Sequence, residues 1–131
     1  MRIARLGVMR LQPGLYVYVG SAFGPGGLAA RIQHHRQTAA NPHWHIDYLR
    51  AICGLVEVWF TTSTIRREHS WANALAQMPG AGVPMPGFGS SDCDCESHLF
   101  WYERMPSVRA FRQRVKTPVG RTQAAAFNVG P

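Results

Sequence analysis

Leu15-Tyr16-Val17-Tyr18-Val19-Gly20 is the stretch of sequence that decides the fold. Its β-branched and aromatic residues predict a strand that is covered on both faces. A glycine-rich loop over residues 21–27 follows, and the spacing after it predicts a helix over residues 28–38. This order of strand, loop and helix makes a helix N-terminus available to an anion.

The rest of the chain continues this mixture of strands and helices. Further strands are expected over residues 3–11, 55–61 and 98–103. Helices are expected over 43–51, from 63 or 64 to 78, and from 106 to about 116. We therefore expect an α+β (mixed α/β) fold with a small central antiparallel β-sheet of about three strands flanked by helices. One domain would span residues 1–116, and residues 117–131 would form a flexible C-terminal tail.

Composition and charge favour an anionic partner. The chain has 131 residues, 46% of them hydrophobic, and a net charge of +7. All but one of its 14 basic residues are arginine, and this planar cation suits bidentate contacts to phosphate. Every acidic residue lies between Asp47 and Glu103, so basic segments flank an acidic centre. This pattern is compatible with a phosphate-backbone binder that holds a cation, and the alternative is a solvated basic surface.

Compartment follows from hydropathy and cysteine content. The sequence has no run of 18 apolar residues, which argues against a membrane span and a membrane partner. Its three cysteines are an odd number and do not make a disulfide framework. A reducing cytoplasm is therefore the expected location.

Three polar residues occupy helix faces that ought to be apolar. Arg31 and His35 share a face with Leu28 and Ile32 in the first predicted helix. Glu68 falls on an otherwise apolar face of the later helix. Because a buried charge is costly unless it is paired or ligated, these residues indicate a site. A structural Arg31–Glu68 ion pair, or partial exposure at the edge of each face, is the alternative.

Cys93, Cys95 and His98 form a local group of metal-ligand side chains. Zinc needs a fourth ligand, and the usual four-ligand spacings are absent. The candidates for that ligand are Cys53, His43, His45 and His69. Reduced, half-buried cysteines are the favoured interpretation of this group, and hydrogen-bonded structure is the favoured interpretation of His43 and His45.

Three blocks of sequence carry a family resemblance. The first is Tyr18-Val19-Gly20-Ser21-Ala22, followed by Gly26-Gly27-Leu28, Arg31 and His35. The others are His43-Trp44-His45-Ile46-Asp47-Tyr48-Leu49 and Gly87-Phe88-Gly89-Ser90-Ser91-Asp92-Cys93. In this order they resemble the GIY-YIG nuclease family, and within it the small stand-alone archaeal-type domain of the Uri superfamily. The resemblance runs from about residue 3 to residue 102.

The resemblance implies divalent-metal-dependent hydrolysis of a nucleic-acid phosphodiester, with DNA as the expected substrate. Tyr18 then corresponds to the tyrosine that helps activate water, and Arg31 to the arginine that holds the scissile phosphate. His35 corresponds to a supporting histidine, and Glu68 to the ligand of a single Mg²⁺ or Mn²⁺. Basic residues outside this group are expected to contact the nucleic-acid backbone: Arg36, Arg109, Arg112, Arg114 and Lys116.

One departure concerns the first family motif, Gly-x-Tyr, which normally lies on its own upstream strand. Here Gly14-Leu15-Tyr16 has the letters but shares a strand with Tyr18, so the first-motif strand is not evident. Tyr16 projects to the same face as Tyr18 and is a candidate substitute. Two alternatives stay open beside an active nuclease. One is a catalytically weak or inactive nucleic-acid-binding module, and the other is a zinc-stabilised interaction domain.

Overall fold

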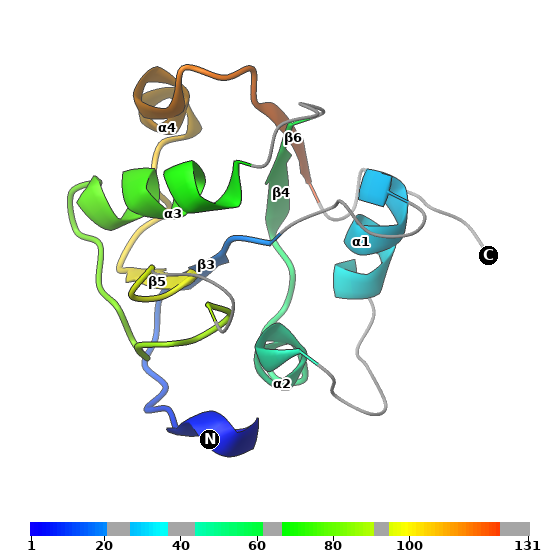
Figure 1. Ribbon diagram of the computed structural model, residues 1–131, viewed down its shortest axis with the longest axis vertical. Helices are drawn as coiled ribbons and strands as arrows, with labels where there is room; N and C mark the ends of the chain where they lie inside the picture. The colour runs from blue at the N-terminus through cyan, green and yellow to red at the C-terminus, as the bar shows by residue number, and fades with distance from the viewer. Residues whose placement is uncertain (21–26, 37–43, 62–66, 91–94, 124–131) are drawn as a thin grey trace.

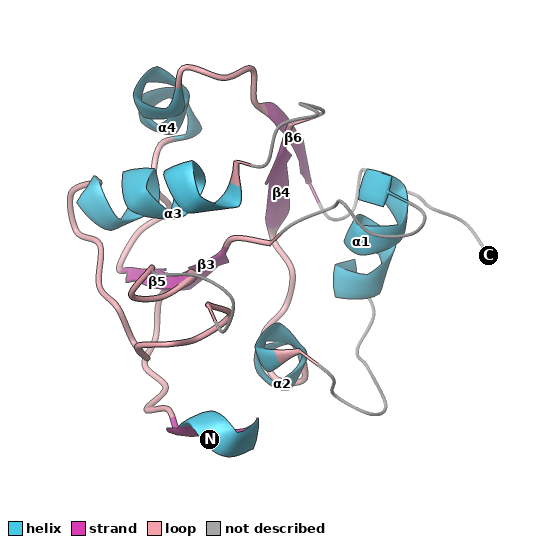
Figure 2. Cartoon of the chain, in the orientation of Figure 1, coloured by secondary structure: helices cyan, strands magenta, loops and turns pink. Residues whose placement is uncertain are grey.

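The computed structural model describes residues 1–20, 27–36, 44–61, 67–90 and 95–123. The fold is α+β, as the sequence predicts: four α-helices surround short antiparallel strands (Figure 2). In the described residues the strands form three separate two-stranded sheets, not one sheet of three strands. The pairs are β1 with β2, β3 with β5, and β4 with β6.

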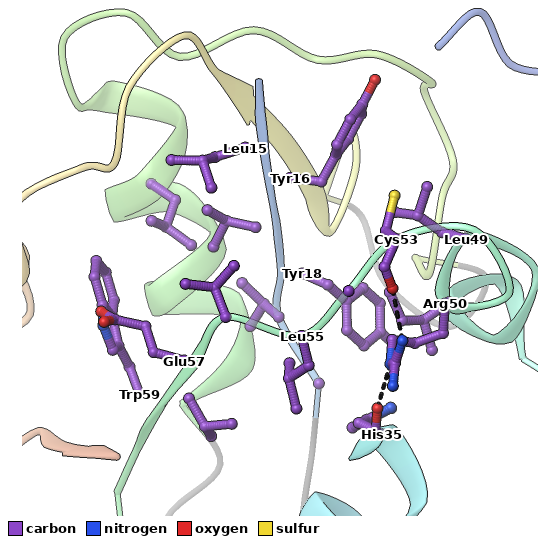
Figure 3. Close-up of a pocket in the computed structure, with 18 of the residues that line it drawn as sticks. Leu15, Tyr16, Tyr18, His35, Leu49, Arg50, Cys53, Leu55, Glu57 and Trp59 are labelled. Carbon is purple, nitrogen blue, oxygen red and sulfur yellow. Dashed lines mark hydrogen bonds between the residues drawn. The ribbon is translucent and has the colours of Figure 1, made fainter. Parts of the chain in front are cut away.

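The deciding stretch forms β3, Leu15–Tyr18, which pairs antiparallel with β5, Leu99–Tyr102. In this register Tyr18 lies opposite Leu99 and Leu15 opposite Tyr102. A backbone hydrogen bond from Val19 N to the His98 carbonyl, 2.9 Å long, extends the pairing by one step. Alternation along β3 sends Tyr16 and Tyr18 to one side and Leu15 to the other (Figure 3).

Part of the expected tail is a strand, which corrects the prediction for residues 117–123. β6, Gly120–Gln123, pairs antiparallel with β4, Glu57–Phe60. Val119 holds the segment that leads into β6. Its side chain is buried, and its carbonyl accepts a 3.1 Å hydrogen bond from Arg112 Nε. Residues 124–131 lie outside the described residues.

The prediction of a single strand over residues 3–11 is also wrong. Two short strands, β1 (Arg2–Ile3) and β2 (Gly7–Val8), pair with each other around a 3-10 helix, η1, at Ala4–Leu6. Ala4 has φ 45° and Gly7 has φ 120°, so the chain folds back where a continuous strand would need extended backbone. The alternation of arginine and apolar residues resembles a strand, but the glycine interrupts it.

The helices lie close to the predicted ranges and have the bounds Gly27–Arg36 (α1), His45–Arg50 (α2), Glu68–Gln77 (α3) and Val108–Val115 (α4). At the start of α4 the Ser107 hydroxyl accepts a 3.1 Å hydrogen bond from Ala110 N, as expected of an N-cap serine. α3 begins later than predicted, at Glu68, and residues 62–66 lie outside the described residues. Glu68 is therefore in the first turn of its helix, where a carboxylate is favoured.

Two apolar clusters make the core. The first joins α3 and α4 to β5 and includes Trp71, Leu75, Tyr102 and Phe111. The second joins the N-terminal segment to α2 and to the loop after α3, whose Met85 and Phe88 are buried. The irregular segment over residues 79–90 is therefore part of the core.

A groove of about 420 Å³ separates β3 from β4. Residues 14–20 line one side of the groove and residues 54–59 the other (Figure 3). The groove is also bordered by Leu49 and Arg50 of α2 and by Cys53, which follows that helix. Among the described residues, β3 pairs with β5 and β4 with β6, and no ladder crosses this groove. The groove brings strands from two sheets and residues of α1 and α2 into one region.

Candidate active site

Tyr18, at the end of β3, is the centre of the predicted site. Its ring meets His35 of α1 edge-on, with centroids 5.8 Å apart, and meets Phe88 in the same manner at 6.2 Å. Gly89 lies so close that a Cβ there would fall 2.8 Å from the Tyr18 ring. The side chain is therefore held on several sides by residues from different elements.

The charges around Tyr18 show which other predicted residues come near it. Burial raises the pKa of the Tyr18 phenol to about 12. The positive charge of Arg31 lowers this pKa, whereas the negative charges of Glu68 and Asp47 raise it. His35 therefore contacts Tyr18, and Arg31 of α1 and Glu68 of α3 lie within electrostatic range of it.

Arg31 lies with its guanidinium over an indole ring. The Arg31 Cζ atom is 4.2 Å from the centroid of the Trp44 ring, which is within the range of a cation–π contact. The indole ring lies against the guanidinium, whose N–H donors lie in the plane of the group. This geometry suits an arginine that binds an oxyanion through its edge.

His35 is a half-buried, neutral imidazole. Burial lowers the pKa of His35 to about 4, and the nearby His34, Arg31 and Arg50 lower it further while Asp47 opposes them. The Nδ1 atom is buried and has no hydrogen-bond partner among the described residues. The imidazole is therefore uncharged at neutral pH, and its Nδ1 can accept a proton or a hydrogen bond from a ligand.

Arg50 fixes the end of the helix that carries these residues. Its Nε donates to the His35 carbonyl at 2.5 Å and its Nη2 to the Arg36 carbonyl at 2.8 Å. A third bond runs from Nη1 to the Cys53 carbonyl at 2.6 Å (Figure 3). Arg50 thus satisfies carbonyls at the C-terminus of α1 and ties α1 to α2. No motif in the sequence marks this residue.

Glu68 lies within electrostatic range of His98 and precedes His69 in the chain. His98 is 3% exposed, and its Nε2 atom has no hydrogen-bond partner among the described residues. The His98 and His69 ring centroids are 6.1 Å apart. Burial lowers the pKa of His98, whereas the negative charge of Glu68 raises it. His98 is thus next to the predicted metal ligand.

The predicted zinc group is only partly described. Cys93 lies outside the described residues, and Cys95 is half-buried against the first apolar cluster. The other histidine block includes His43, also outside the described residues, and His45, whose Nδ1 accepts a 2.8 Å hydrogen bond from Gly89 N. The prediction of hydrogen-bonded structure is confirmed for His45.

Tyr16 has a local hydrogen-bonding role. Its hydroxyl accepts from Gln12 N at 3.1 Å and donates to the Gln12 carbonyl at 3.2 Å. Tyr16 shares a side of β3 with Tyr18, as predicted, but its hydroxyl is bonded to the segment before β3 (Figure 3).

Asp47 is the polar residue of this region that the pattern analysis missed. It is 3% exposed, its Oδ1 lies 2.7 Å from His34 Nε2, and its Oδ2 accepts a 2.9 Å hydrogen bond from Trp44 N. The available signal was an acidic residue at the third position of a helix, which bonds back to the N-cap. His34, His35 and Asp47 also bring metal-ligand atoms within 4.8 Å of one another.

Two observations favour a hydrogen-bonded anchor over a cation at that group. Both Asp47 oxygens already accept or share hydrogen bonds. The positive charges of Arg31 and Arg50 lower the pKa of His35, whereas the negative charge of Asp47 raises it. Positive charge close to the group opposes the binding of a metal cation.

The predicted nucleic-acid contacts divide between two surfaces. Arg109, Arg112, Arg114 and Lys116 are exposed along α4 and its C-terminal end, whereas Phe111 of the same helix is buried. α3 lies between α4 and the β3–β5 pair (Figure 1). Arg36 is half-buried at the end of α1, near the Tyr18 site.

Comparison with known proteins gives the family of the chain. No curated protein and no solved structure matches it. None of the helices in the described ranges has the length and apolar character needed to traverse a bilayer. Residues 1–120 match the family model described as "Domain of unknown function DUF123", and the chain therefore belongs to the DUF123 family.

Proposed function

We propose that this protein is a divalent-metal-dependent endonuclease of the GIY-YIG type that hydrolyses phosphodiester bonds in DNA. The observation that carries the proposal is the convergence of Tyr18, Arg31, His35 and Glu68. Sequence pattern singles out Arg31, His35 and Glu68 as misplaced polar residues, and the fold brings them to one tyrosine. Phosphodiester hydrolysis needs a water nucleophile, positive charge on the phosphate and help for the leaving oxygen.

The residues present fit a single Mg²⁺ or Mn²⁺. Glu68 supplies a carboxylate, the hard oxygen donor that these ions prefer. His98, whose buried Nε2 has no hydrogen-bond partner among the described residues, lies within electrostatic range of Glu68, and neutral imidazole is a ligand that Mn²⁺ accepts. When bound, such an ion would neutralise phosphate oxygens and lower the pKa of a water molecule.

The protein side chains would divide the remaining work. Arg31 would bind the non-bridging oxygens of the phosphate through the edge of its guanidinium. Tyr18 is protonated at neutral pH, so its hydroxyl would orient the attacking water. It would act as a base only if the positive charge of a bound cation lowered the pKa of the phenol. His35 is neutral and can accept a proton or a hydrogen bond at Nδ1. Arg36 and the basic face of α4 would contact backbone phosphates, which gives affinity without base specificity.

A second candidate function is a nucleic-acid-binding module of the same fold with little or no activity. The raised pKa of Tyr18 and the local hydrogen bonds of Tyr16 favour it, because both withhold a phenolate base from the site. The two candidates differ in cleavage and not in binding.

A nicking assay separates the candidates. Supercoiled plasmid and hairpin DNA are incubated with the protein and Mg²⁺ or Mn²⁺, and cleavage is followed for the wild type, Tyr18→Phe and Glu68→Gln. The nuclease predicts metal-dependent nicking that falls by about 10²- to 10⁴-fold in both variants. DNA binding without cleavage, unchanged by Glu68→Gln, supports the binding module instead. Zinc in the purified protein, lost in Cys95→Ser and His98→Gln, would support the interaction domain.

A further inference from the structure

The motif around Trp44 has no role in the proposed reaction, yet it contacts the residue expected to hold the phosphate. The Trp44 ring lies under the Arg31 guanidinium, with Cζ 4.2 Å from the ring centroid. An arginine side chain carries several rotatable bonds, and fixing it beforehand removes part of the entropy cost of orienting it on the phosphate in the transition state. An aromatic ring beside the guanidinium can do this without accepting hydrogen bonds as a carboxylate would.

Trp44 is itself held by the buried carboxylate of Asp47. The Trp44 backbone N–H donates to Asp47 Oδ2 at 2.9 Å, and Asp47 Oδ1 lies 2.7 Å from His34 Nε2. The His34 ring packs against the Trp44 ring with centroids 4.5 Å apart and planes 66° apart. One carboxylate therefore fixes both the backbone that carries the indole and a ring that contacts it.

These contacts run from the start of α2 to α1. Asp47 and Trp44 belong to the beginning of α2, whereas His34 and Arg31 lie one turn apart on α1. Arg50, near the end of α2, bonds the carbonyls at the C-terminus of α1. α2 therefore holds α1 at two points, through Asp47 and through Arg50. The orientation of Arg31 depends on these contacts, although neither residue is assigned to the reaction itself.

We propose that Trp44 and Asp47 are positioning residues that orient the Arg31 guanidinium toward the phosphate. The proposal rests on the proposed nuclease function for the ligand of Arg31. The indole restricts the position of the guanidinium, and Asp47 fixes the indole. Phenylalanine in place of Trp44 keeps a π face and should retain most of the effect, whereas leucine keeps only bulk and should lose it.

The first experiment does not depend on cleavage. In nuclear magnetic resonance spectra of the full chain, the indole ring current should shift the Arg31 Nε–Hε signal away from its position in an unstacked arginine. We expect this shift to disappear in Trp44→Leu, to persist in part in Trp44→Phe, and to decrease in Asp47→Asn. Trp101→Phe is the matched control, because Trp101 is on β5 and its indole donates to the Pro13 carbonyl at 3.2 Å. An Arg31 signal that is the same in the wild type and in Trp44→Leu overturns the proposal.

The second experiment measures DNA cleavage with Mn²⁺ at steady state. Trp44→Leu should lower kcat about tenfold, the size of a desolvated cation–π contact, and change KM much less. Trp44→Phe should restore most of kcat, and Trp101→Phe should leave both constants unchanged. A loss that is equal in Trp44→Leu and Trp44→Phe contradicts positioning by a π face.

The two proposals fail in different ways. If the wild type does not cleave DNA, the nuclease proposal fails, while the Arg31 signal still decides whether Trp44 orients the guanidinium. If Trp44→Leu does not fold, the comparison of the wild type with Trp44→Phe decides, since the smaller ring current of a phenyl group must move the Arg31 signal. An unmoved signal in Trp44→Phe then overturns the proposal.

Discussion

The His35 imidazole meets the Tyr18 ring edge-on, with centroids 5.8 Å apart and planes 72° apart. Burial acts on the two groups in opposite directions, because it lowers the pKa of His35 to about 4 and raises that of Tyr18 to about 12. Both groups are therefore uncharged over a wide range around neutral pH. The positive charge of Arg31 lowers the pKa of Tyr18, and the negative charge of Glu68 raises it.

The stability of the protein should fall in mild acid because of His35. Its pKa is about 4 in the folded chain and near 6.5 in the unfolded chain, so its stabilising effect is complete above pH 6.5. As the pH falls from 6.5 to 4, the unfolded state binds more protons and the free energy of unfolding decreases, on the order of 2 kcal/mol. Chemical denaturation at several pH values measures this decrease. His35→Gln should flatten the profile over this window, and an unchanged slope would contradict the assignment to His35.

Tyr18 should titrate near pH 12, and its pKa should respond in opposite directions to two substitutions. Arg31→Gln removes a positive charge and should raise the pKa further, whereas Glu68→Gln removes a negative charge and should lower it. Nuclear magnetic resonance of ring-labelled tyrosine follows the titration, with Tyr18→Phe assigning the signal. The stabilising effect of the protonated phenol is complete below pH 10 and is lost as the pH rises to 12. Equal shifts in both variants would argue that the three residues do not share a site.

Divalent cation binding should depend on Glu68 and not on Asp47. Glu68→Gln and Asp47→Asn are matched changes from a carboxylate to an amide, and calorimetric titration with Mn²⁺ compares them. We expect Glu68→Gln to weaken binding at least tenfold, because a neutral amide is a poorer ligand. Asp47→Asn should bind Mn²⁺ as the wild type does. The reverse order would move the cation to the group of His34, His35 and Asp47.

The basic face of α4 should set the salt dependence of DNA binding. Replacing Arg109 and Arg114 with glutamine should reduce the slope of log K against log salt by about 1 for each phosphate contact removed. Fluorescence anisotropy with a labelled duplex at several salt concentrations measures the slope. Arg104→Gln, an exposed arginine outside α4, is the control. A slope that is the same in the wild type and the double variant would exclude α4 from the interface.

Gly120 should not tolerate a side chain, because β6 lies closely against β4. A Cβ at Gly120 would fall 2.4 Å from Phe60 Cζ, whereas a Cβ at Gly54 would meet no atom within 4 Å. Gly120→Ala should therefore destabilise the protein by about 1–3 kcal/mol, the usual cost of overpacking. Gly54→Ala should change the free energy of unfolding little. Urea denaturation of the two variants tests this, and equal stabilities would contradict the pairing of β6 with β4.

Local sequence signals predicted the elements that local chemistry determines. The β-branched and aromatic run produced β3, and Ser107 marked the start of α4. The strand expected over residues 3–11 failed because Gly7 turns the chain inside an apparently alternating pattern. β6 could not be predicted in the same manner, since its pairing with β4 joins segments about 60 residues apart in the sequence.

The residues of the candidate site also differ in whether local sequence or contacts between distant segments reveal them. Arg31 and Glu68 were detectable because helical spacing put charged residues on apolar faces. Trp44 and Asp47 were not, because a stack on Arg31 and a hydrogen bond to His34 exist only after α1 and α2 approach each other. A motif can therefore be visible in the sequence while its contacts are not.

The groove between β3 and β4 has a mechanical consequence. A continuous sheet would link Tyr18 to Trp59 through a ladder of backbone hydrogen bonds, whose directional geometry resists shear. In the described part of the chain, no such ladder joins the two strands, and apolar side chains line the space between them. Apolar contacts are non-directional and resist sliding less. We therefore expect the distance between the β3–β5 and β4–β6 pairs to change more readily than the distances within either pair, and Tyr18 lies at the border between them.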